Sequence, residues 1–168
     1  MKTEPNYFRK FPVPPEVINI QGFGMDPRQL VEKAEQLSLE DNYDQVWCVF
    51  DRDSWPADNF SGAMASAQSK GFRVAYSNEA FELWYMLHFN YYDTGIPRSE
   101  YISRLHTLLG KPYVKNSDTI YAELESRMED AIRNAARLLA QYDPPNPAQN
   151  NPSTTVHLLV EELRRFSR

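Results

Sequence analysis

The chain has 168 residues, of which 42% are hydrophobic and 24% are charged, as in ordinary soluble globular proteins. This length predicts one domain, or one domain with a small appendage. With 18 basic and 23 acidic residues, the net charge is -5, which excludes a polybasic nucleic-acid binder. Any contact with nucleic acid therefore requires a local basic patch or a bridging cation.

The sequence also indicates the compartment in which we expect the protein. Cys48 is the single cysteine, so no intramolecular disulfide can form, and its place in an apolar run predicts a buried, inert thiol. No apolar run has the length of a membrane span, and the N-terminal residues lack the apolar core of a signal peptide. We therefore expect a cytoplasmic protein without a membrane partner.

Strand and helix patterns alternate over the first half of the chain. The predicted strands are residues 17–22, 46–50 and 72–76. A predicted helix follows each strand: one starts at Pro27 with Asp26 as N-cap, one spans about residues 60–70 before Gly71, and one runs from a Ser77–Asn78 cap through Phe89. This order predicts an α/β fold with a parallel sheet and flanking helices.

The second half of the chain carries only helical patterns. The predicted helices are residues 98–109, 118–141 and 153–166. Residues 143–152, with four prolines, are typical of a linker. We therefore predict an α/β domain over residues 1–92 and a helical extension, packed on that domain, over residues 93–168.

Two carboxylates follow the most apolar predicted strand. Asp51 and Asp53 lie at its carboxyl end, where open parallel sheets bind ligands, and residues two apart in a strand point the same way. Unpaired at about 5 Å, they would repel by roughly 3 kcal/mol at an effective dielectric near 20. Mg²⁺ would offset this repulsion and keep waters for a phosphate substrate. The other interpretation is a polar turn in which Arg52 or Arg73 compensates the charge.

Glu82 is a candidate because its predicted helix is apolar on nearly every side. Its large apolar neighbours are Phe81, Leu83, Trp84, Tyr85, Met86, Leu87 and Phe89. Such a helix is buried, and a buried carboxylate is costly unless it is paired or binds a metal. The other interpretation is that Glu82 complements the helix dipole. His88 is typical of a hydrogen-bonded core histidine.

Several other residues have side chains that can take part in a site. Lys115 can act on a phosphate as a point charge, although a solvated loop lysine is the commoner case. Four aromatic residues can stack bases or belong to the core and its rim: Trp47, Trp55, Tyr91 and Tyr92. The three histidines are too dispersed for zinc, and no phosphate-binding loop of the G-x-x-x-x-G-K type occurs.

The ordered set of segments resembles the RloB-like family, bacterial proteins with a Toprim-type catalytic domain. The matching residues are Lys2 to Phe8, Tyr43-Asp44, Trp47 to Asp53, Ser77-Asn78, Phe81 to Trp84 and His88-Phe89, with weaker matches at Tyr113 to Lys115, Ala131-Ile132, Asn134-Ala135, Pro152, Thr154 and Val156. They cover nearly the whole chain, and the set is more specific than any one segment.

The resemblance implies a site and a reaction. Toprim domains bind Mg²⁺ (or Mn²⁺) through an acidic residue after their first strand and a D-x-D after a later strand, and they cut or join phosphodiester bonds. Asp51 and Asp53 match the D-x-D, while Glu82 and Lys115 match other polar positions of the family. The implied partner is DNA or RNA, including tRNA, and the implied role is antiviral defence at restriction and abortive-infection loci, often beside an ATPase.

The sequence departs from the family pattern at its start. The family begins with an apolar strand and Glu-Gly-Glu-Lys-Thr-Glu, whereas this sequence begins at Met-Lys-Thr-Glu. Glu4 holds the last position of that motif, so the first strand and its glutamate are missing from the sequence given. Three explanations stay open: a start downstream of the true one, substitution by Glu4, or impaired catalysis. The missing strand would leave an exposed sheet edge or gap.

Three functions follow from these observations. The first is a Mg²⁺-dependent nuclease in which Asp51, Asp53 and Glu82 bind metal, with Lys115 and Glu4 as further catalytic residues. The second is a non-catalytic Toprim scaffold that docks an ATPase subunit. The third is a haloacid-dehalogenase phosphatase with Asp51 as nucleophile, which ranks last because Trp55 stands where that family has Thr or Val.

Overall fold

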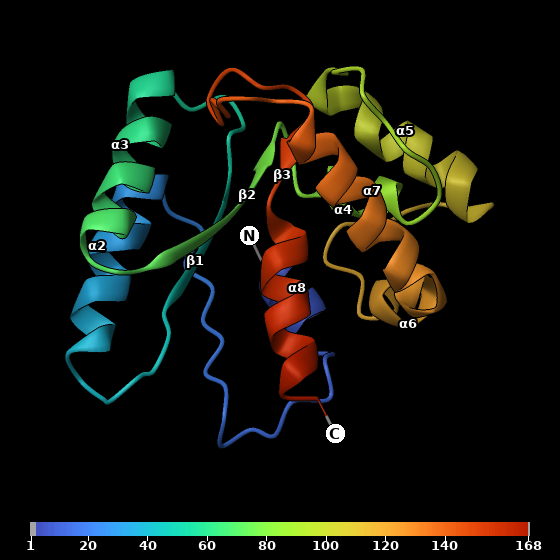
Figure 1. The fold of residues 1–168 in the computed structure, drawn as a ribbon. Helices are drawn as coiled ribbons and strands as arrows, with labels where there is room; N and C mark the ends of the chain where they lie inside the picture. Colours follow the sequence, from blue (N-terminus) through green and yellow to red (C-terminus); the bar gives the residue numbers. More distant parts are fainter. Residues whose placement is uncertain (1–2, 168) are drawn as a thin grey trace.

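A small mixed sheet lies at the centre of the fold (Figure 1). The structure is a computed structural model, and it describes residues 3–167. Strand β1 (Trp47–Asp51) pairs in parallel with β2 (Arg73–Asn78), and β2 pairs antiparallel with the short β3 (Ser153–Thr154). The predicted parallel pairing is therefore confirmed for two strands, and the third strand comes from the C-terminal part of the chain.

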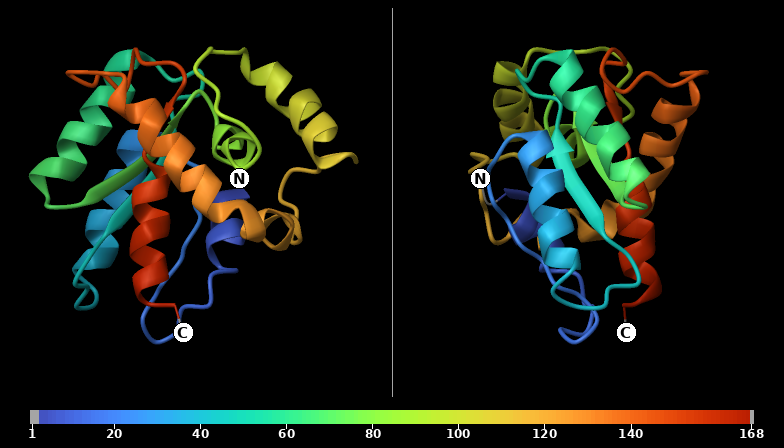
Figure 2. Two further views of the ribbon diagram at one scale, coloured as in Figure 1. Left: turned by 45° about the vertical axis from the view of Figure 1, so that its right-hand side comes forward. Right: turned by 90° about the vertical axis from the view of Figure 1, so that its left-hand side faces the viewer.

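Helices cover both faces of this sheet. They are α1 (Thr3–Phe8), α2 (Pro27–Ser38), α3 (Ala57–Ser69), α4 (Glu82–Leu87), α5 (Arg98–Leu109), α6 (Ile120–Leu124), the 3-10 turn η1 (Glu125–Arg127), α7 (Met128–Ala140) and α8 (Val156–Arg165). Figure 2 shows α2 and α3 on one face and α7 with α8 on the other. Phe50 and Phe60 belong to the smaller apolar cluster with α2 and α3, whereas the larger cluster surrounds α4.

Local sequence signals account for the helices that were predicted correctly. The Asp26 Oδ1 atom accepts hydrogen bonds from the backbone N–H groups of Arg28 (3.0 Å) and Gln29 (3.2 Å), and Pro27 opens the helix. Gly71, with φ of +75°, follows the end of α3 in the left-handed conformation. The helix predicted at residues 98–109 is confirmed as α5.

One predicted strand and two predicted boundaries were wrong. Residues 17–22 form no strand. Ser77 and Asn78 belong to β2 and do not cap α4, which begins at Glu82. Residues 153–154 form β3, so the last helix begins at Val156. In addition, the pattern at residues 118–141 resolves into α6, η1 and α7.

Hydroxyl groups of the C-terminal strand explain why it pairs with the sheet. The Thr154 hydroxyl donates to the Tyr76 carbonyl at 2.9 Å and lies 3.0 Å from the Ser77 hydroxyl. The Thr155 hydroxyl donates to the Val74 carbonyl at 3.2 Å. These bonds satisfy polar groups at a buried edge. They also join the predicted extension to the predicted α/β domain, whose division at residue 92 stays a prediction.

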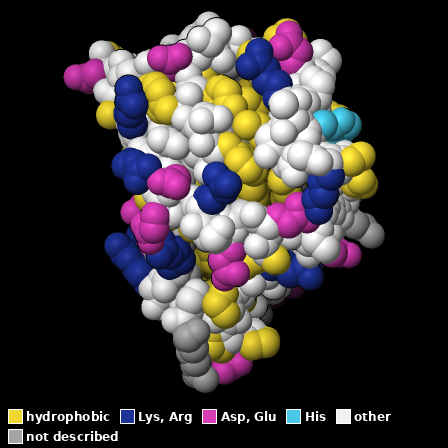
Figure 3. All heavy atoms as spheres, turned by 90° about the vertical axis from the view of Figure 1, so that its right-hand side faces the viewer, with side chains coloured by type: hydrophobic (Ala, Val, Ile, Leu, Met, Phe, Trp, Pro, Cys, Tyr) yellow, Lys and Arg dark blue, Asp and Glu magenta, His cyan; other side chains and the backbone are white. Residues whose placement is uncertain are grey.

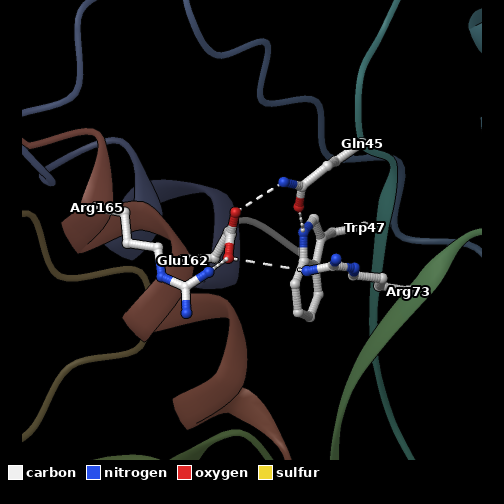
Figure 4. A network of polar contacts seen from close by, with 5 residues as sticks. All are labelled: Gln45, Trp47, Arg73, Glu162 and Arg165. Carbon is white, nitrogen blue, oxygen red and sulfur yellow. Dashed lines mark hydrogen bonds and ion pairs between the residues drawn. The ribbon is translucent and has the colours of Figure 1, made fainter.

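A polar network fastens α8 to the opposite end of the strands (Figure 4). Glu162 of α8 accepts a hydrogen bond from Gln45 at 2.7 Å and pairs with Arg165 at 2.9 Å and Arg73 at 3.8 Å. The side-chain carbonyl of Gln45 accepts a hydrogen bond from the Trp47 indole at 3.1 Å, and the Arg73 guanidinium lies 5.4 Å from the centre of that ring.

None of the helices within residues 3–167 has the length and apolar character of a membrane span.

Candidate functional site

The candidate site lies where β1 ends. Asp51 is the last residue of β1 and stands opposite Ser77 of β2. The segments that follow β1 and β2 stay hydrogen-bonded beyond that point. The Arg52 N–H donates to the Ser77 carbonyl at 2.8 Å, and the Asp53 N–H donates to the Glu79 carbonyl at 2.9 Å. The chain after β2 therefore folds back over the end of β1.

Three acidic side chains from separate elements gather here, and we call them the carboxylate cluster: Glu4 of α1, Asp51 of β1 and Glu82 of α4. Burial, followed by repulsion from Glu4 and Glu82, raises the pKa of Asp51 well above its ordinary value. Burial and repulsion from Glu82 also raise the pKa of Glu4. Burial and mutual repulsion thus both disfavour the ionised forms of Asp51 and Glu4.

Glu82 has two partners in the loop between α5 and α6. Its side chain is 5% exposed, and its Oε1 atom lies 3.6 Å from Lys115 Nζ. The Tyr113 hydroxyl donates to the same oxygen at 3.4 Å. The structure thus brings together Glu82 and Lys115, two of the sequence candidates that lie far apart in the chain. Both contacts are long for direct bonds, which leaves the carboxylate available to a further partner.

Asp53 is held differently. Its backbone is in the left-handed region, with φ of +45°, and its Oδ1 atom lies 2.6 Å from Arg98 Nη1 at the start of α5. Neither predicted compensating arginine fills this role, because Arg52 donates to the carbonyls of Trp55 and Ala148 and Arg73 lies on Trp47.

Sequence reasoning missed Arg98 and Glu79. The backbone N–H of Arg98 donates to Glu79 Oε2 at 2.9 Å. Glu79 thus provides an acceptor for an otherwise unpaired N–H in the first turn of α5 and helps to position Arg98. Pro97 before Arg98 signals a helix start. No local signal connects that start with Asp53, which lies 45 positions earlier in the chain.

The donor atoms of the cluster suit a hard divalent cation. Within residues 3–167, no three His, Cys, Asp or Glu side chains converge as a complete set of metal ligands. Mg²⁺ needs one or two carboxylates and fills its other positions with water and phosphate oxygen. Asp51 and Glu4 are oxygen donors whose pKa values are raised first by burial and then by repulsion from the neighbouring acids. As carboxylates, the two side chains are of the donor type that such an ion takes.

A buried hydroxyl group near the cluster lacks a partner. Tyr85 is 0% exposed, and its hydroxyl has no hydrogen-bond partner among the described residues. Burial first, and then the neighbouring acidic groups, among them Glu82 and Glu4, raise its pKa well above the ordinary value. Tyr85 is thus a neutral donor beside the cluster, and its place in an apolar helix had concealed it from sequence reasoning.

Two other sequence candidates lie in the core. His88 is 0% exposed, and its Nδ1 atom is 2.9 Å from the Trp84 carbonyl, as expected for a core histidine. Burial lowers the pKa of His88 to about 4, so the ring is neutral at physiological pH. Cys48 is buried, and burial raises the pKa of its thiol to about 11. The prediction of a buried thiol is confirmed.

The comparisons agree with the resemblance seen in the sequence. Residues 1–163 match the family described as RloB-like protein. No curated protein and no solved structure matches the chain. The match covers nearly the whole sequence, including every residue of the carboxylate cluster, so the chain belongs to the RloB-like protein family.

Proposed function

We propose that this protein is a Mg²⁺-dependent, nuclease-like enzyme that cleaves phosphodiester bonds of DNA or RNA in bacterial antiviral defence. The observation that carries the proposal is the carboxylate cluster at the end of a parallel strand, with the pKa values of Asp51 and Glu4 both raised. Parallel sheets bind ligands at this edge, and strongly perturbed acids mark functional sites. A Toprim-like arrangement of the sheet belongs to the same proposal.

Each residue has a role in this scheme. Asp51 and Glu4 would hold Mg²⁺, with Glu82 as an added ligand or base. The ion would supply an activated water and stabilise the leaving oxygen. Lys115 would place its ammonium charge against a phosphate oxygen, and Tyr113 would orient Glu82 through its hydrogen bond. Asp53 would order the strand end through its ion pair with Arg98 and would serve as a metal ligand once that pair opens.

The charge distribution supports local neutralisation of phosphate. Figure 3 shows basic and acidic side chains interspersed on the side of the molecule that carries α5. A protein with this surface and a net charge of -5 lacks the uniform basic field of a general nucleic-acid binder. Binding of the substrate phosphate would therefore depend on the ion, on the ammonium group of Lys115 and on the guanidinium group of Arg98.

A nicking assay tests the proposal. Purified protein is incubated with supercoiled plasmid, single-stranded DNA and tRNA in the presence of Mg²⁺, Mn²⁺ or EDTA. Cleavage should require the metal and be lost in Asp51→Asn, which keeps side-chain volume while removing the charge. Asp143→Asn is the matched control, because Asp143 is exposed in the segment between α7 and β3. Metal-dependent cleavage that persists in Asp51→Asn would contradict the assignment.

A second function is favoured by one feature of the site. Arg98 and Lys115 already pair with two of the predicted acids, Asp53 and Glu82, which suits a scaffold without catalysis. We infer that such a scaffold would dock an ATPase subunit. Isothermal titration calorimetry with MgCl₂ separates the two functions. Absence of metal binding, together with isolation of the protein in a stable complex with an ATPase, would support the scaffold.

A further inference from the structure

The segment between α5 and α6, which carries Lys115, is tied to the N-terminal helix through Asn116. The Asn116 Oδ1 atom accepts a hydrogen bond from the Thr3 hydroxyl at 3.0 Å, and the Asn116 backbone carbonyl accepts one from the Asn6 side chain at 3.3 Å. Thr3 and Asn6 belong to α1, which lies beside this segment (Figure 2). Asn116 thus connects the two elements that supply Glu4 and Lys115 to the candidate site.

The backbone of Asn116 has a conformation that few side chains adopt. Its φ is +62°, in the left-handed region, where asparagine is several-fold enriched among residues other than glycine. A residue such as alanine would strain the backbone at this position and would lack the acceptor that Thr3 uses. The residue type therefore suits both the turn after Lys115 and the contact with α1.

Other bonds fasten the two ends of the same segment to the helices that flank it. The His106 Nε2 atom lies 3.2 Å from the Tyr113 carbonyl, which ties the first part of the segment to α5. The Thr119 hydroxyl donates to Glu123 Oε1 at 2.7 Å, which ties the last part to α6. These bonds lie at least two positions from Lys115. The contact with α1 is made at the next residue and therefore bears on Lys115 most directly.

The placement of Lys115 matters because its partner is fixed in the core. The Glu82 side chain is 5% exposed, and its Oε1 atom lies 3.6 Å from Lys115 Nζ. The Lys115 side chain is 37% exposed, and its flexible stem gives the ammonium group several positions in solvent. Because the attraction between charges falls with distance and with exposure to water, a shift of the Lys115 backbone would weaken the pair.

We propose that Asn116 is a positioning residue, which holds the Lys115 segment on α1 and thereby keeps the Lys115 ammonium group at Glu82. The contact with Glu82 is independent of catalysis, whereas the action of Lys115 on a phosphate oxygen rests on the proposed function. Since α1 also carries Glu4, the bonds of Asn116 set the position of the phosphate-neutralising group relative to a metal ligand. Misplacement of such groups by a small distance is costly in rate.

The first experiment does not require catalysis. Urea unfolding of Glu82→Gln, Lys115→Met and the double variant gives the coupling between the two residues. The same cycle is then measured in an Asn116→Gly chain, because glycine keeps the left-handed turn and removes the side-chain acceptor. We expect the coupling to fall by about half or more in that chain, since the ammonium group gains access to solvent. An unchanged coupling would overturn the proposal.

Three further backgrounds test whether the Thr3 contact is responsible. Thr3→Val removes the hydroxyl donor and should lower the coupling as Asn116→Gly does, whereas Thr3→Ser keeps the donor and should restore it. Ser117→Ala removes a bond to Thr119 within the same segment, leaves the bonds of Asn116 to α1 in place, and should keep the wild-type coupling. An equal loss in Ser117→Ala would contradict the role of Asn116. If Thr3→Val fails to fold, Asn116→Gly, at an exposed position, keeps the test decisive.

The nicking assay connects this inference with the proposed function. Asn116→Gly should lower kcat/KM about tenfold or more, and it should have no further effect in a Lys115→Met chain, because both changes remove the same ammonium group from the site. Losses that multiply would overturn a role that acts through Lys115. If the wild-type protein cleaves no substrate, the proposed function fails, and the unfolding cycles alone decide whether Asn116 positions Lys115.

Discussion

Lys115 Nζ lies 3.6 Å from Glu82 Oε1, although the two residues are separated by α5 and its flanking loops. Glu82 is buried and Lys115 is 37% exposed at its side chain. The pair therefore links a buried carboxylate to a cation that solvent can reach. This arrangement suits a lysine that turns from the carboxylate to an incoming phosphate.

The Glu82–Lys115 pair gives a prediction about stability. Lys115→Met should lower the free energy of unfolding by about 1–2 kcal/mol, because it leaves the buried Glu82 carboxylate without its cationic partner. The loss is moderate because Lys115 itself is partly exposed to solvent. Combining it with Glu82→Gln should recover part of that loss, because the stranded charge is then absent. Urea unfolding of the two single variants and the double variant measures the coupling. Additive losses would contradict the ion pair.

Asp51→Asn should stabilise the metal-free protein near neutral pH. Burial, Glu4 and Glu82 raise the pKa of Asp51, so the folded state holds this proton more tightly than the unfolded chain does. The resulting stabilisation is complete below the ordinary carboxyl pKa of about 4 and is lost as pH rises through the raised value.

Thermal unfolding across this pH range measures the effect. The melting temperature of Asp51→Asn should match that of wild type in acid and exceed it at neutral pH. Asp143→Asn, at an exposed position, should follow wild type throughout. If Asp51→Asn were less stable than wild type at neutral pH, the ionised carboxylate would be a favourable part of the metal-free fold, contrary to the cluster described above.

Mg²⁺ should stabilise the wild-type protein. Binding to the folded state alone adds about 2.7 kcal/mol when the ion is at a hundred times its dissociation constant. The effect should grow with pH, because the raised pKa of Asp51 means that the metal displaces a proton. Differential scanning fluorimetry with and without MgCl₂ checks both points. Equal stabilisation of wild type and Asp51→Asn would place the ion elsewhere.

His88 should make the protein sensitive to acid. Burial lowers its pKa from 6.5 to about 4, so the unfolded chain binds the proton first, and stability falls as pH drops from about 6.5 to about 4. The gap between these values corresponds to roughly 3 kcal/mol. His88→Gln should remove the part of this loss that His88 causes in urea unfolding at the two pH values. His157, whose pKa burial also lowers to about 4, keeps its own part. The exposed His106 provides the control, and His106→Gln should keep the wild-type loss.

Much of the fold is predictable because its signals are local. The Asp26 cap and Pro27 define α2 through bonds within one turn. The apolar run before Asp51 correctly predicts a strand, although β1 lies at the edge of the three-stranded sheet and not at its centre. The apolar helix around Glu82 correctly predicts that this carboxylate is buried. Each inference depends on residues within a few positions of one another. Residues that are close in the sequence remain close in the folded chain, so their interactions can be inferred from the sequence.

The failures arise where distant segments compete with local preference. Ser77 and Asn78 have the composition of a helix cap, but pairing with β3 extends β2 through them. Residues 17–22 have a strand pattern, yet they contact Arg9, Tyr43 and Pro5 and do not pair with β1. In both places, tertiary contacts satisfy the backbone or the apolar side chains better than the predicted local structure would.

The sequence by itself therefore determined the candidate acids, the buried helix of Glu82 and the RloB-like resemblance, because residue type and local spacing carry this information. Only the tertiary structure decided which charges meet. It pairs Asp53 with Arg98 and gathers Glu4 and Asp51 with Glu82. The reason is physical: interactions between charges depend on distance and burial in space, and separation along the chain does not report either quantity.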